Sequence, residues 1–184
     1  AGDINPHYLH YLTNFAHGKP YLEVEKIDLE APADFAAWRE SVEAVVCLNV
    51  LEHVRDPDVS LRNLHGALEP GGRVVLYVPQ DPKLYAPLDE KLGHRCRYTR
   101  EQLQAELEAA GFVDIELRDF NRFGRLGWWW NCKVRGRLEF GRVQLKIFDT
   151  LVPILRRIDR FWPWKGLGLI ATARKPSTPA GRDT

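Results

Sequence analysis

The chain has no methionine, only three cysteines among its 184 residues, and no long apolar run. Cys47, Cys96 and Cys132 are far apart and include no C-x-x-C pair, so the sequence predicts neither a disulfide framework nor a metal site. There is no stretch approaching the roughly 18 apolar residues that span a bilayer, and no secretory signal pattern. We therefore expect a cytoplasmic protein. The missing first methionine also indicates that the sequence begins inside a longer gene.

Length and charge are typical of one folded domain. With 45% apolar residues, the chain can bury one core but is short for two domains. The net charge of +1 hides a division, because acidic residues outnumber basic ones up to residue 121, whereas Lys and Arg dominate residues 122–165. The chain contains no nucleic-acid-binding motif, so nucleic acid is not an expected partner.

Helical and strand patterns alternate along the chain. Strand 44–48 is wholly apolar, which is typical of a strand buried on both faces. The alternation predicts an α/β fold over residues 1–175, with a Rossmann-like, doubly wound, mostly parallel sheet, followed by a disordered tail at 176–184. The expected strands are 21–27, 44–48, 74–78, 112–120 and 167–174, and the expected helices are 7–17, 33–41, 58–68 and 99–110.

Residues 121–165 interrupt this alternation and predict a helical insertion before the last strand. Trp128, Trp129 and Trp130 are followed by apolar residues at helical spacing with basic residues among them. One interpretation is a cap that packs over the active site. The other is peripheral contact of residues 126–164 with an anionic membrane, at its inner face, or with a lipid-linked substrate.

The residues that follow the expected strands carry the functional signal, because ligands of open α/β sheets bind outside the carboxyl ends of the strands. Asp3 opens D-I-N-P, Asp28 follows the next strand, and the segment 49–54 (N-V-L-E-H-V) follows the apolar strand. A Pro-Gly-Gly turn at 70–72 then precedes strand 74–78. With these segments in this order, the chain resembles the class I S-adenosylmethionine-dependent methyltransferases, in particular a bacterial group with V-L-E-H-V and L-x-P-G-G segments.

The resemblance implies S-adenosyl-L-methionine as the cofactor and assigns residues to it. Asp3 would accept hydrogen bonds from both ribose hydroxyls, which suits the two oxygens of a carboxylate. Asp28 would lie near the adenine amino group. The other residues assigned to the cofactor are Ile4 and Leu29 beside the adenine, and Asn49 and Val50 next to the methionine moiety.

One feature of the family is absent from this sequence. The family's first strand ends in a glycine-rich turn of the form E-x-G-x-G, and this chain has no such segment. In the family that strand lies in the middle of the sheet, between the strand before Asp3 and the strand before Asn49. We therefore expect a partial methyltransferase domain whose sheet lacks its first strand and which binds the cofactor poorly by itself.

Candidate catalytic residues lie at the same end of the sheet. Glu52 and His53 form a titratable pair that could act as a general base, although His53 could equally pack against or cap the next helix. His94 and Tyr98 lie in a basic loop and suit an anionic or hydroxyl-bearing substrate, although solvation at the surface explains them as well. Methyl transfer can also proceed by alignment of the reactants alone.

The sequence thus predicts transfer of a methyl group from S-adenosylmethionine to a small-molecule acceptor or to a lipid- or glycan-linked one. One alternative is a catalytically silent methyltransferase-like module that binds a membrane surface or a partner protein. Another is a nicotinamide-dependent enzyme, but the chain has neither G-x-G-x-x-G nor Y-x-x-x-K. The sequence predicts neither the acceptor atom nor the oligomeric state.

Overall fold

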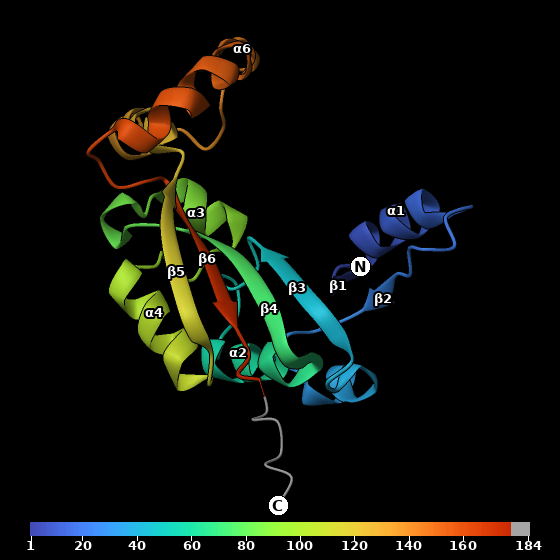
Figure 1. Ribbon diagram of the computed structural model, residues 1–184. Helices are drawn as coiled ribbons and strands as arrows, with labels where there is room; N and C mark the ends of the chain where they lie inside the picture. Colours follow the sequence, from blue (N-terminus) through green and yellow to red (C-terminus); the bar gives the residue numbers. More distant parts are fainter. Residues whose placement is uncertain (178–184) are drawn as a thin grey trace, which may run out of the picture.

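The computed structural model describes residues 1–177, without the side chains of residues 144, 156 and 160. The predicted tail at 176–184 falls almost wholly outside the described residues. Strands β3 (Val42–Leu48), β4 (Leu68–Pro79), β6 (Gly168–Arg174) and β5 (Val113–Phe120) form a four-stranded sheet in the order β3-β4-β6-β5, in which β3 and β4 are parallel and β6 is antiparallel to both of its neighbours (Figure 1). This mixed α/β architecture confirms the predicted fold class.

A second, separate sheet holds the first two strands. Strands β1 (Gly2–Asp3) and β2 (Glu25–Lys26) pair in parallel, and neither is hydrogen-bonded to the four-stranded sheet. Figure 1 shows β1 beyond the free edge of β3. The division falls between the strand that ends at Asp3 and the strand that precedes Asn49, which is where the sequence places the missing strand.

Three helices begin at a residue whose side chain caps the helix. Helix α1 (Pro6–Ala16) is capped by Asn5, whose Oδ1 accepts from His7 N at 2.9 Å. Helix α4 (Arg100–Ala109) is capped by the Thr99 hydroxyl, which accepts from Gln102 N at 3.1 Å. The Gln102 side chain donates to Glu106 Oε1 at 2.9 Å, one turn further along the helix. Helix α2 (Pro57–Ala67) is capped by Asp56, whose Oδ1 accepts from Val59 N at 3.0 Å.

Two early elements differ from the prediction. The strand expected at 21–27 is only β2, since its partner β1 offers just two residues for pairing. The helix expected at 33–41 is a 3-10 segment, η1 (Pro32–Trp38). The residue at its N-cap position, Ala31, has no side chain that can cap an α-helix.

Helices α2 and α4 cover one face of the four-stranded sheet and form the core with it. Fully burying a Leu or Val side chain stabilises the fold by about 1.5–3 kcal/mol. The core residues on these elements include Leu61 and Leu64 on α2, Leu103 and Leu107 on α4, Val74, Leu76 and Val78 on β4, and Leu169 and Ala171 on β6.

Strand β3 is an edge strand, so the expectation that it is buried on both faces is wrong for the described chain. Cys47 is buried, but Val46 and Leu48, on the opposite face, are 65% and 53% exposed. The reason is that β3 pairs only with β4 and its other side borders the space toward β1.

The segment between β5 and β6 is helical, as predicted. It contains α5 (Arg122–Trp128), a π-helical turn η3 (Trp129–Val134), α6 (Arg142–Ile158) and a 3-10 turn η4 (Asp159–Phe161). Because it leaves β5 and returns to β6, it lies at the carboxyl ends of β3, β4 and β5 (Figure 1). It rests on the loop that contains η2 (Pro82–Leu84) and α3 (Pro87–Leu92). Within the described residues, no helix is long and apolar enough to cross a membrane.

Candidate active site beside the edge of the sheet

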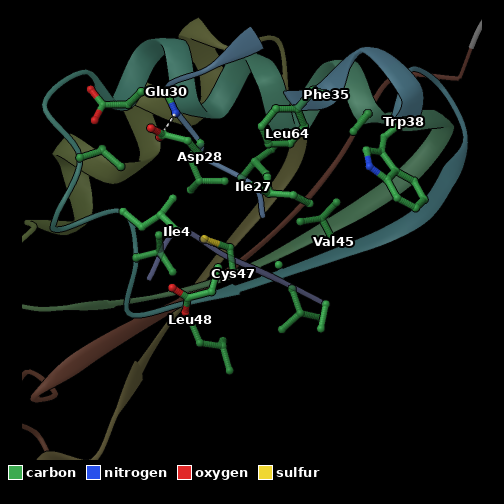
Figure 2. A pocket seen from close by; sticks show the side chains of 18 of the residues that line it. Ile4, Ile27, Asp28, Glu30, Phe35, Trp38, Val45, Cys47, Leu48 and Leu64 are labelled. Atoms are coloured by element: carbon green, nitrogen blue, oxygen red, sulfur yellow. Dashed lines mark hydrogen bonds between the residues drawn. The ribbon is translucent and has the colours of Figure 1, made fainter. Parts of the chain in front are cut away.

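A cleft of about 650 Å³ lies between the two sheets, with β1 on one side and β3 on the other (Figure 2). Its volume is in the range of small-molecule sites. Five of the six predicted cofactor-binding residues line it; these are Asp3, Ile4, Asp28, Leu29 and Val50. The cleft thus brings together residues that the chain separates by up to about fifty positions.

Both aspartates are oriented by backbone hydrogen bonds at the cleft. Asp3 Oδ1 accepts from Asn5 N at 2.7 Å. Asp28 Oδ1 accepts from Glu30 N at 2.9 Å (Figure 2). Asp28 N in turn donates to Asp34 Oδ2 at 2.9 Å. In each carboxylate the Oδ2 atom remains an acceptor for ligand donors.

Asn49 does not line the cleft. It sits directly after β3 in the left-handed region, with φ of 53°, and its backbone N donates to Tyr77 O at 3.0 Å. Its neighbour Val50 does line the cleft and is 38% exposed. The roles assigned to Asn49 and Val50 stay predictions.

The residues present fit the adenosine half of S-adenosylmethionine better than its methionine half. Asp3 and Asp28 offer carboxylate acceptors for hydroxyl and amino donors, and Ile4, 58% exposed, offers an apolar surface for a ring. The β3 wall of the cleft is instead apolar, with Val46 and Leu48 exposed along it. No glycine-rich turn lies between β1 and β3 in the described part of the chain.

A second group of predicted residues meets beside this cleft. His53 lines the cleft, and its ring packs edge-on against His94 with 4.9 Å between the ring centroids. His94 Nε2 lies 3.8 Å from Oε1 of Glu52, whose side chain is fully buried. Burial is the largest cause and raises the pKa of the Glu52 carboxyl above its ordinary value, and the charge of Arg97 offsets only part of this. Burial also lowers the pKa of His53, against the effect of its hydrogen bond to Gly93.

A buried ion pair between Asp89 and Arg97 contacts this group through the His94 ring. Asp89 and Arg97 are both buried, and Arg97 Nε lies 3.0 Å from each carboxylate oxygen of Asp89. Burial alone would raise the pKa of Asp89, but its hydrogen bonds with His94 and Arg97 outweigh burial and lower it. The guanidinium of Arg97 lies 4.4 Å from the ring of Trp128, which belongs to the helical segment before β6.

Tyr98 is placed differently from the prediction of a catalytic residue. Its side chain is fully buried in the core, and its hydroxyl donates to Leu51 O at 3.3 Å. Arg95 N donates to Glu52 O at 2.8 Å, and Arg95 Nε donates to His53 O at 3.0 Å. Tyr98 and Arg95 therefore hold the backbone of residues 51–53, and Tyr98 has no surface with which to contact a substrate.

Sequence reasoning missed Asp89, which joins His94 to Arg97. It stands in P-L-D-E-K-L, a segment that reads as the solvated start of a short helix, and Asp89 Oδ2 indeed accepts from Ala86 N at 2.9 Å. The only signal in the sequence is the arginine eight positions later, which is too weak to predict an ion pair.

Comparison with known proteins identifies the family. The sequence model of the family described as "Methyltransferase domain" matches residues 10–117, more than half of the chain. No curated protein matches the chain significantly.

Solved methyltransferase structures share the fold. The CMeT domain of the citrinin polyketide synthase has a TM-score of 0.64 at 12% identity, covering 96% of this chain and 38% of that one. Phosphoethanolamine N-methyltransferase 2 of Haemonchus contortus, in complex with S-adenosyl-L-methionine, has a TM-score of 0.60 at 17% identity, covering 96% and 43%. A SAM-dependent methyltransferase from Archaeoglobus fulgidus has a TM-score of 0.58 at 16% identity, covering 95% and 74%.

The chain spans about two fifths of the length of the first two of these structures, and at such identities the likeness is one of fold. Together with the match of the family sequence model, it confirms the resemblance seen in the strand-end motifs: the chain belongs to the methyltransferase domain family, whose members use S-adenosylmethionine.

Proposed function

We propose that this domain transfers a methyl group from S-adenosylmethionine to a small-molecule or lipid- or glycan-linked acceptor bound in the cleft between β1 and β3. The observation that carries the proposal is the pair of aspartates, Asp3 and Asp28, each anchored by a backbone N–H on the wall of one cleft. Asp3 would bind the ribose hydroxyls and Asp28 the adenine amino group.

S-adenosylmethionine, when bound, supplies the methyl group. His53 is the predicted catalytic residue that lines the cleft, and a neutral imidazole there can hold the proton that a hydroxyl or amine acceptor loses. His94, against its ring, would position it.

Binding of S-adenosylhomocysteine and of adenosine to the 184-residue chain, followed by NMR chemical shifts, tests the proposal. Because the cleft fits mainly the adenosine half, we expect weak binding of both ligands, with affinities within about threefold of each other, which is less than 1 kcal/mol. Shifts should concentrate on residues of the cleft. Asp3→Asn should weaken both ligands, whereas Asp58→Asn, on the exposed side of α2, should weaken neither. Absence of shifts in the cleft at millimolar ligand would contradict the proposal.

A second property, contact with a membrane surface, is favoured by α6. Val143, Ile147 and Ile154, at helical spacing, are 74%, 56% and 60% exposed, and none of the described side chains of 121–165 lines the cleft. We propose that this apolar side of α6 inserts into an anionic membrane, as the basic composition of the segment favours.

Flotation with vesicles of anionic lipid tests this contact. The chain should float with the vesicles, and the double variant Ile147→Ser/Ile154→Ser should lose about 2–4 kcal/mol of apolar transfer free energy and remain at the bottom. Asp149→Asn on the same helix is the matched control and should float. Failure of the unaltered chain to float removes the membrane interpretation.

A further inference from the structure

Three side chains beside the cleft form a donor set that no feature of the sequence predicts. Glu52, His53 and His94 each offer one ligating atom, and these atoms all lie within 4.8 Å of one another. The set joins one carboxylate to two imidazoles, and the third member comes from a loop forty residues away along the chain.

Both imidazole rings are held by a hydrogen bond at Nδ1. His94 Nδ1 lies 2.8 Å from Asp89 Oδ1, and His53 Nδ1 lies 3.1 Å from Gly93 O. A carbonyl oxygen can only accept, and the Asp89 carboxylate, paired with Arg97, also accepts, so each Nδ1 carries the hydrogen. In the neutral rings the lone pair is therefore on Nε2. Histidine ligands of metal ions are oriented in this way, by a carboxylate or carbonyl on the nitrogen that does not bind the metal.

The third residue, Glu52, contributes a carboxylate that has no hydrogen-bond donor among the described residues. Its side chain is fully buried, and within residues 1–177 no hydrogen bond from another residue reaches either carboxylate oxygen. The nearest polar atom of the cluster, His94 Nε2, faces Oε1 at 3.8 Å with its own lone pair. Two acceptors that face each other in a buried place are costly unless a cation or a proton lies between them.

We propose that Glu52, His53 and His94 bind a divalent transition-metal ion. Two imidazoles with one carboxylate suit ions such as Zn²⁺ or Fe²⁺ better than Mg²⁺ or Ca²⁺, which prefer sites built from oxygen ligands. Ligands about 2.1 Å from a tetrahedral ion lie about 3.4 Å apart, so the widest separation in the cluster must contract by up to about 1.4 Å. The half-buried side chain of His53 can make that movement.

The position of the site would let the ion contact a ligand bound in the cleft. Because His53 also lines the cleft, the remaining coordination positions would face a ligand in the cleft, where the ion could bind a hydroxyl or carboxylate oxygen. A bound ion would occupy the Nε2 lone pair of His53, so His53 could not then hold the proton of the acceptor, and the metal site is an alternative to that role. It is tested by metal binding alone.

Titration of the chelator-treated 184-residue chain with ZnCl₂ in a calorimeter tests the proposal. We expect one high-affinity ion per chain, and Glu52→Gln and His53→Gln should each weaken it by at least about tenfold, since even the partners of metal ligands contribute that much. Circular dichroism checks that both variants fold, and His53→Gln removes only a half-buried side chain.

The matched control is His7→Gln, which removes an exposed histidine in the first turn of α1 and should leave the affinity unchanged. Absence of binding would overturn the proposal and leave a shared proton between Glu52 and His94. Binding that both site variants leave intact would place the ion elsewhere, for example on cysteine thiols, and would also overturn it. Displacement of Zn²⁺ by an equal concentration of MgCl₂ would overturn the choice of a transition metal.

Discussion

The buried ion pair between Asp89 and Arg97 allows a quantitative test of how the loop before α4 is held. Arg97 contacts the Asp89 carboxylate through Nε at 3.0 Å and through Nη2 at 2.9 Å. The side chain of Asp89 is 0% exposed and that of Arg97 is 1% exposed. Asp89→Asn removes the counter-charge but keeps nearly the same shape. Removing one partner of a buried pair costs about 3–5 kcal/mol, because it leaves the other charge uncompensated. The remaining amide oxygen can still accept from Arg97, so we expect the lower end, about 3 kcal/mol.

Urea unfolding followed by circular dichroism measures this cost. With a slope of about 2 kcal/mol per molar, a loss of about 3 kcal/mol moves the midpoint down by about 1.5 M. Asp58→Asn is the control, because Asp58 pairs with Arg62 on the surface with both side chains about half exposed, and such pairs contribute about 1 kcal/mol or less. If Asp89→Asn costs no more than Asp58→Asn, the guanidinium is solvated and the reasoning fails.

Two further predictions concern stability. The raised pKa of Glu52 means that its neutral form is stabilising below its ordinary pKa of 4.5 and that this stability is lost as pH rises through the higher folded pKa. With chelator present, the stability of Glu52→Gln relative to the unaltered chain should therefore increase as the pH rises above 4.5 in urea titrations. Gly168→Ala places a Cβ against the Tyr77 ring and should cost about 1–3 kcal/mol, whereas Gly127→Ala, in open space, should cost nothing in thermal unfolding.

Local signals predicted those elements that short-range contacts determine. Asn5 and Thr99 cap helices because their side chains reach backbone N–H groups two and three residues ahead, a contact that the sequence itself contains. The apolar run 44–48 forms a strand for a similar reason. Its burial depends on a neighbour on the β1 side, and no periodicity within the run contains that information.

The candidate site was predictable in part, for a related reason. Asp3, Asp28 and Val50 each lie at or just after the carboxyl end of a strand, where ligands of open α/β sheets bind, and the structure brings all three to one cleft. Asn49 and Tyr98 also lie in loops that follow strands in the sequence, but neither residue lines the cleft. The backbone at Asn49 turns into the left-handed region, and Tyr98 points into the core rather than toward the edge.

The helical segment before β6 is connected to the site by a chain of contacts. Trp128 stacks on Arg97, Arg97 pairs with Asp89, and Asp89 accepts from the ring of His94. Each contact fixes the next: without the indole, the guanidinium gains access to water, the ion pair weakens, and His94 loses the partner that sets its tautomer. Trp128 also donates to Leu84 O at 3.1 Å, so its position is itself fixed by the loop that it covers. None of the described side chains of residues 121–165 lines the cleft, yet the segment is connected in this way to the His94 ring beside it.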